Sequence, residues 1–119
     1  DSSNSNKGLI MSYIYLFSAI VFEVIGTMLL PISKNFTKPL ISILLVIAYM
    51  LSFYFLTFAL KEIPIAVAYS TWAGVGIFLI TLFGYLFYGQ SIQWQSLIGL
   101  IFIALGVAIV NTFKNESML

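Results

Sequence analysis

The segment SAIVFEVIGTMLL, residues 18–30, places one glutamate, Glu23, in a run that is otherwise apolar or small. No residue within ten positions of Glu23 on either side carries a charge. A carboxylate at the centre of a bilayer costs about 2.5 kcal/mol or more, and acids found there usually mark a substrate or proton pathway. Glu23 is therefore the first candidate for chemistry, as a group that binds a cation or a proton.

Small residues share the helical face of Glu23. At spacings of three and four residues, a helix would place Ala19, Gly26 and Thr27 on that face. These residues either leave space beside the carboxylate or let another backbone approach closely. A structural role for Glu23 stays open as well. That role would need a protonated acid hydrogen-bonded to a tyrosine or serine, because no Lys or Arg lies within the expected spans.

Aromatic residues on two later segments suggest what Glu23 binds. Tyr69, Trp72 and Gly76 would share one face of a helix, and Tyr49 and Ser52 would share a face of the preceding one. Aromatic rings around a carboxylate suit a hydrophobic cation, through cation–π attraction and apolar contact. The alternative is that these aromatics only pack or anchor the helices at the membrane interface.

The composition identifies an integral membrane protein. Of the 119 residues, 61% are hydrophobic and only 8% are charged, whereas soluble domains have about 45–50% and about 25%. Cysteine and histidine are absent, which excludes disulfides, thiol nucleophiles and the common transition-metal ligands. A net charge of +1 without a basic run does not favour a nucleic-acid partner. We expect no enzymatic activity, no cofactor and no metal.

The apolar runs predict an all-α fold with four transmembrane helices, each near the ~20 residues that a span requires. The expected spans are about 12–30, 40–60, 64–88 and 94–113, within a single domain over residues 11–114. The polar residues 1–10 are interpreted as a leader or a segment foreign to the native chain, and residues 115–119 as a polar tail.

The lysines in the turns are balanced across the membrane. With Lys7 in the polar segment over residues 1–10 left aside, Lys34 and Lys38 lie on one side, and Lys61 and Lys114 on the other. Because Lys/Arg bias in short loops sets orientation, its absence favours insertion both ways round; the alternative is that other signals fix one orientation.

Glycines predict where helices meet. Gly74 and Gly76 would allow close packing or a bend in the third helix. Gly99 and Gly106, seven residues apart, predict a helix-packing seam on the fourth. One four-helix chain with a single membrane acid lacks a chamber for a solute. Two antiparallel chains would supply eight helices and two copies of Glu23, as inverted repeats do within larger transporters.

Several motifs together resemble the small multidrug resistance family of bacterial transporters. They are YIYL (13–16), EVIGT (23–27), IP…AYSTWAGVGI (63–77) and GLIFIALGV (99–107), and the resemblance spans Met11 to Asn111. It implies an antiparallel homodimer in the bacterial cytoplasmic (inner) membrane that exchanges protons for hydrophobic, often aromatic, cations. A heterodimer of two related chains stays open.

The resemblance also implies roles for individual residues. Glu23 would bind the proton or the substrate, and Ser52 would influence which cations are accepted. The gating and substrate-contact aromatics fall on Tyr13, Tyr49, Tyr69 and Trp72. The dimer seam of the fourth helix falls on Gly99, Gly106 and Val107.

Two local features qualify the resemblance. Pro31 stands where the family commonly has a lysine. The guanidinium-exporting branch carries a tryptophan shortly after the glutamate, whereas VIGTMLL (24–30) resembles the quaternary-ammonium branch. Two alternatives remain: an exporter of guanidinium or polyamines with the same architecture, and a non-transporting membrane assembly partner.

Overall fold

The computed structural model describes residues 2–113, with side chains from residue 6 onward. Over this range the chain forms four α-helices: α1 (Ser2–Leu29), α2 (Pro39–Ala59), α3 (Ile65–Tyr88) and α4 (Trp94–Thr112). Each contains a segment long and apolar enough to cross a membrane. The prediction of an all-α fold with four membrane-spanning helices is confirmed. Lys114 and the tail over residues 115–119 lie outside the described residues.

The helix boundaries match the expected spans to within one residue, except at the start of α1. This helix begins at Ser2, ten residues before the expected span, and its membrane-compatible segment is Asn6–Leu29. Serine and asparagine are only mildly unfavourable in a helix. The polar segment over residues 1–10 is therefore helical from Ser2 onward and continues the first span.

Prolines and one glycine set most of the remaining ends. α1 ends two residues before Pro31, because the residue before a proline is disfavoured in the helical conformation. Pro39 occupies the first turn of α2, where its missing N–H breaks no bond. Pro64 was expected in the first turn of α3 but is its N-cap. α3 ends at Gly89, whose φ of 66° is left-handed and favours glycine.

The turn between α1 and α2 is built around Ser33. Lys34, Asn35 and Phe36 all have positive φ angles, of 48°, 61° and 64°, and the left-handed region costs a non-glycine residue about 1–2 kcal/mol. The buried Ser33 hydroxyl donates to the Leu30 carbonyl at 2.7 Å and accepts the Phe36 N–H at 3.2 Å. These local bonds hold the turn that follows Pro31.

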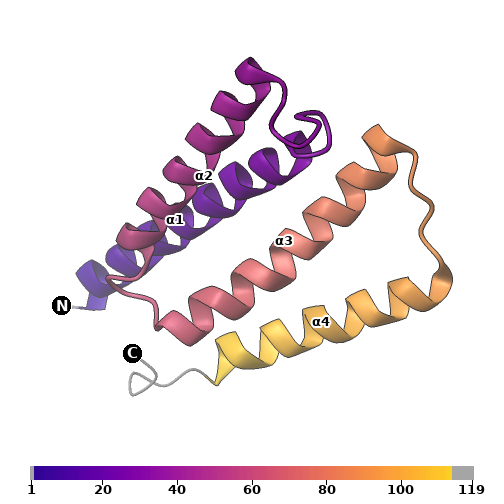
Figure 1. The fold of residues 1–119 in the computed structure, drawn as a ribbon. Helices are drawn as coiled ribbons and strands as arrows, with labels where there is room; N and C mark the ends of the chain where they lie inside the picture. The colour runs from indigo at the N-terminus through magenta and orange to yellow at the C-terminus, as the bar shows by residue number, and fades with distance from the viewer. Residues whose placement is uncertain (1, 114–119) are drawn as a thin grey trace.

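The core lies where α1 meets the end of α2 and the start of α3. Figure 1 shows α1 and α2 as a closely packed hairpin, with α3 alongside. The buried cluster consists of Leu16, Ile20, Val24, Ala59, Ile63, Val67 and Ala68. Many large apolar side chains on the outer faces are exposed, as expected for a protein whose surrounding solvent is lipid.

α4 is the least enclosed helix. None of its residues is buried. It lies closest to α3 near the start of α3 and diverges from it toward the connection at residues 89–93 (Figure 1). At the close end, a Cβ atom on Gly74 would lie 2.4 Å from Val107 Cγ2. The placement of α4 in the single chain therefore depends on few contacts.

Candidate cation-binding site

α1, α2 and α3 together line an open pocket of about 620 Å³ beside Glu23. Its lining consists of Glu23, Tyr49, Phe53, Leu56, Tyr69, Trp72 and Ala73. The volume falls within the ~300–1,000 Å³ typical of small-molecule sites. One carboxylate among aromatic and aliphatic side chains is the arrangement that the sequence predicted for a hydrophobic cation.

The Glu23 carboxylate is held on one side by a relay of hydroxyl groups. The Thr27 hydroxyl donates to Glu23 Oε1 at 3.0 Å and lies 2.8 Å from the Tyr49 hydroxyl. A threonine hydroxyl has one hydrogen to donate, so Tyr49 donates to Thr27 and Thr27 donates to Glu23. The first bond orients the carboxylate, and the second orients the Thr27 hydroxyl that bonds it.

The second carboxylate oxygen is available for a ligand. Among residues 2–113, Glu23 Oε2 has no hydrogen-bond partner. It lies beside Gly76, where an added Cβ would be 3.9 Å from Oε2 and 3.8 Å from Trp72 Cδ1. Gly76 therefore marks the place where the acid and the indole both approach the α3 backbone.

Gly26 allows the tyrosine to reach the relay. A Cβ atom there would lie 3.2 Å from Cε1 and Cζ of Tyr49, closer than ordinary contact. The small residues beside Glu23 were expected either to leave open space or to let another backbone approach closely. At Gly26 the neighbouring helix α2 approaches closely.

The aromatic side chains differ in exposure. Tyr69 is 77% exposed, so it forms the rim of the pocket, whereas Trp72 and Tyr49 are half-buried. The Phe53 and Trp72 ring centroids are 6.2 Å apart. Phe53 was not predicted, although Phe53 and Leu56 follow Tyr49 by four and seven residues, which is the spacing of one helix face.

Ser52, expected to influence which cations are accepted, does not itself line the pocket. It is fully buried, and its hydroxyl donates to the Ala19 carbonyl at 2.7 Å. A hydroxyl in an apolar interior requires an acceptor, and the α1 backbone supplies it. Ala19, also fully buried, is the point where α2 approaches α1 one turn before Glu23.

Tyr13 also lies away from the Glu23 pocket. Its hydroxyl donates to Asn111 Oδ1 at 2.7 Å, which connects α1 to α4. Val107, expected at a dimer seam, packs against Gly74 of its own chain. Among the described residues, Gly99 and Gly106 have no atom within 4 Å of an added Cβ, so residues 2–113 leave their face of α4 unoccupied.

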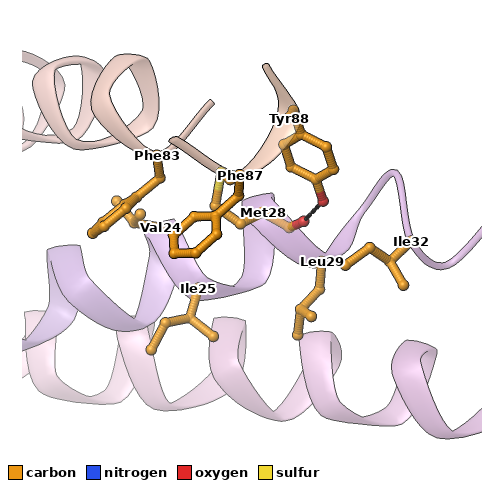
Figure 2. A pocket seen from close by; sticks show the side chains of 8 residues that line it. All are labelled: Val24, Ile25, Met28, Leu29, Ile32, Phe83, Phe87 and Tyr88. Carbon is orange, nitrogen blue, oxygen red and sulfur yellow. Dashed lines mark hydrogen bonds between the residues drawn. The ribbon is translucent and has the colours of Figure 1, made fainter. Parts of the chain in front are cut away.

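A second pocket lies between the ends of α1 and α3. Figure 2 shows its lining of Val24, Ile25, Met28, Leu29, Ile32, Phe83, Phe87 and Tyr88, around about 390 Å³. The Tyr88 hydroxyl donates to the Met28 carbonyl. Because this lining has no carboxylate, it offers no counter-charge for a cation, and the Glu23 pocket is the better candidate.

The sequence over residues 11–103 matches the family model described as small multidrug resistance protein. The chain belongs to this family. Its members are transporters and not enzymes, and they act in efflux of multiple drugs and quaternary ammonium compounds, so cationic drugs are the substrates that the family implies. The predicted family and the predicted non-enzymatic class are both confirmed.

Characterised and uncharacterised relatives cover nearly the whole chain. The multidrug transporter EmrE of Escherichia coli K12 is 44% identical over 105 residues, which cover 88% of this chain and 96% of EmrE. The quaternary ammonium compound-resistance protein QacF of Klebsiella aerogenes is 41% identical over 89% of this chain and 96% of its own. The uncharacterised membrane protein YvaE of Bacillus subtilis is 40% identical over 91% of both chains. These bacterial relatives support a multi-pass membrane protein.

Proposed function

We propose that this protein exports hydrophobic and aromatic cations, including quaternary ammonium compounds, in exchange for protons. Glu23 binds a proton or a cation in turn, and the Glu23 pocket supplies the aromatic surface for the cation. The functional unit is an antiparallel homodimer in the bacterial cytoplasmic membrane. The names of EmrE and QacF support the substrate class, and the geometry of Glu23 supports the coupling site.

The observation that carries this proposal is the half-satisfied carboxylate in an aromatic pocket. Oε1 accepts a hydrogen bond from Thr27, while Oε2 has no partner among the described residues. The preceding lysine on α1, Lys7, is sixteen residues away, or about 24 Å along the helix. Glu23 therefore has no adjacent lysine on its helix, and a proton or a cationic ligand can neutralise it.

Competition for one carboxylate is sufficient for exchange. A protonated Glu23 is neutral and attracts a cation weakly, and a bound cation disfavours protonation. This reciprocal effect is thermodynamic linkage. If the pocket opens to one side of the membrane at a time, the proton gradient drives the cation outward.

Three features support the antiparallel dimer. Lys34 and Lys38 would lie on one side of the membrane. Lys61, in a described loop, would lie on the other side, together with Lys114, which is outside the described residues. α4 has no buried residue, and Gly99 and Gly106 present an unoccupied face. Small-residue faces of this kind are typical of helix contacts in membranes.

One observation favours a second candidate, in which Glu23 is structural. The Tyr49–Thr27–Glu23 relay ties α2 to α1, which is what a non-transporting assembly partner would need. Glu23→Gln separates the two. Its side-chain carbonyl still accepts from Thr27, so the relay survives, but the amide cannot exchange a proton.

Growth of bacteria on toxic cations tests the proposal. Cells with the wild-type chain should resist ethidium and quaternary ammonium biocides, and cells with Glu23→Gln should be sensitive at equal protein levels. Resistance to guanidinium alone would indicate the other exporter class. If the Glu23→Gln cells were as resistant as the wild type, Glu23 would have only a structural role.

The dimer topology has its own test. Two lysines added after Phe113 should bias insertion toward one orientation, because short-loop charge sets topology. Activity should fall, and a copy biased the opposite way should restore it. An oppositely biased pair that is inserted and stable yet inactive would contradict the antiparallel arrangement.

A further inference from the structure

The side chain of Asn111 joins three helices. Its Oδ1 accepts the Tyr13 hydroxyl of α1 at 2.7 Å, and its Nδ2 donates to Thr71 Oγ1 of α3 at 2.8 Å and to the Val107 carbonyl of α4 at 3.0 Å. The amide therefore uses its oxygen and both of its hydrogens. We call Tyr13, Asn111 and Thr71 the interhelical triad.

The triad is a principal attachment of α4 to the rest of the chain. No residue of α4 is buried, and its close approaches to α3 include Val107 against Gly74, one turn away. Membrane interiors offer no water to replace a broken hydrogen bond. The triad therefore fixes how the end of α4 sits against α1 and α3.

Both side-chain partners of Asn111, Tyr13 and Thr71, lie on helices that form the cation pocket. Thr71 directly precedes Trp72, a lining residue, on α3, and Tyr13 precedes Glu23 by ten residues on α1. Neither Thr71 nor Asn111 lines the pocket. Their effect on transport must therefore act through helix position, without contact with the cation.

We infer that Asn111 is a positioning residue: it latches α4 to α1 and to the Trp72-bearing turn of α3 in the conformation seen here. This inference rests on the proposed transport function. A pocket that opens to alternate sides requires α1 and α3 to move relative to their surroundings. The two bonds of Asn111 to Tyr13 and Thr71 resist such movement, so they slow the exchange between conformations without altering the cation site.

The first test compares turnover with affinity in Thr71→Val, which keeps the shape of Thr71 but cannot bond Asn111. Tetraphenylphosphonium is the probe cation. Its transport is measured in proteoliposomes with a pH gradient, and its Kd by equilibrium binding to the purified protein. An interhelical hydrogen bond in a membrane typically contributes about a threefold effect. We expect turnover to rise about threefold while Kd stays within about twofold.

Thr112→Val is the matched control. Within residues 2–113, the Thr112 hydroxyl bonds only the Ala108 carbonyl of its own helix, at 2.8 Å. This variant loses the same kind of group next to the triad without loosening any contact between helices, so its turnover should equal that of the wild type. If Thr71→Val turned over at the wild-type rate or more slowly, the inferred role of Asn111 would be wrong.

A triple variant separates positioning from folding. Asn111→Leu alone removes the amide that both hydroxyls bond, which is destabilising. Tyr13→Phe/Thr71→Val/Asn111→Leu removes all three polar groups together, and replacing both sides of a bond by apolar groups is close to neutral for stability. We expect this variant to fold and to turn over about tenfold faster than the wild type. A stable triple variant with wild-type turnover would show that the triad serves stability alone.

Failure of the latch and failure of the proposed function give different results. If the wild type itself neither binds nor transports tetraphenylphosphonium, the proposed function is wrong, and so is the role in transport inferred for Asn111. If the wild type transports the cation and the variants match it, only the latch is wrong.

Discussion

Gly74 of α3 meets Val107 of α4 without room for a side chain, because an added Cβ would lie 2.4 Å from Val107 Cγ2. This contact lies one turn from the Asn111–Thr71 bond, and the two together define the close end of the α3–α4 pair. A glycine at this point lets two helix backbones approach, as is common in membranes.

Gly74→Ala should therefore destabilise the chain by about 1–3 kcal/mol, the usual cost of overpacking. Denaturation in detergent, followed by loss of helix signal, measures it. Val107→Ala removes the clashing methyl group, so the Gly74→Ala/Val107→Ala pair should recover most of the loss. If the double variant were as unstable as Gly74→Ala alone, the instability would not come from a clash with Val107.

Gly106→Ala distinguishes contacts within a chain from contacts between chains. No atom of the part of the chain that the structure describes lies within 4 Å of an added Cβ at Gly106, so the single chain should fold normally. If α4 packs against a partner through this face, the added methyl group should weaken dimerisation, as read from crosslinking yield or dilution series in detergent. An unchanged dimer would exclude this face of α4 from the interface.

Tyr49→Phe should weaken cation binding while leaving the aromatic lining of the pocket in place. It removes the hydroxyl that donates to Thr27 while keeping the ring that lines the site. A hydrogen bond contributes about 1 kcal/mol, so Kd near neutral pH should rise about fivefold. Tyr54→Phe is the control, because Tyr54 is exposed and its ring does not line the pocket. Equal effects from both substitutions would argue against the relay.

Trp72→Ala and Tyr69→Ala should discriminate between classes of cation. Cation–π and stacking contacts contribute about 0.5–2 kcal/mol, so planar aromatic cations should lose affinity by about two- to thirtyfold. Small alkyl ammonium ions should lose less, because they contact less of each ring. Tyr85→Ala, an exposed residue of α3 outside the pocket, provides the reference. Equal losses for both ligand classes would make these aromatics structural.

Much of the fold could be predicted because lipid imposes a simple rule on sequence. Long apolar runs must be helices, and prolines and Gly89 mark where several of them end. The exception was the start of α1, since a helix can continue beyond the apolar run when no strong breaker intervenes. The positive φ angles at Lys34, Asn35 and Phe36 had no sequence signal either.

The site was predictable in its chemistry but not in its side-chain partners. Glu23, Tyr49, Tyr69 and Trp72 do converge on one pocket, as helical spacing and resemblance predicted. Spacing along one helix cannot reveal contacts between helices. Ser52 therefore proved to bond the α1 backbone, and the Asn111 amide, a polar group near the end of an apolar helix, was not recognised as the partner of Tyr13.

The pH dependence of binding tests the coupling itself. Because a proton and a cation compete for Glu23, tetraphenylphosphonium affinity should rise with pH, by as much as about tenfold per unit for each proton displaced, and level off once the acid is ionised. Binding in weak buffer should release protons over the same range. Glu23→Gln should bind weakly at every pH and release none. Glu23→Asp should keep a pH dependence but transport poorly, because the shorter side chain draws the carboxylate away from Thr27 and the pocket. Affinity that stays constant from about pH 5 to about pH 9, with no proton release, would mean that coupling occurs at another group.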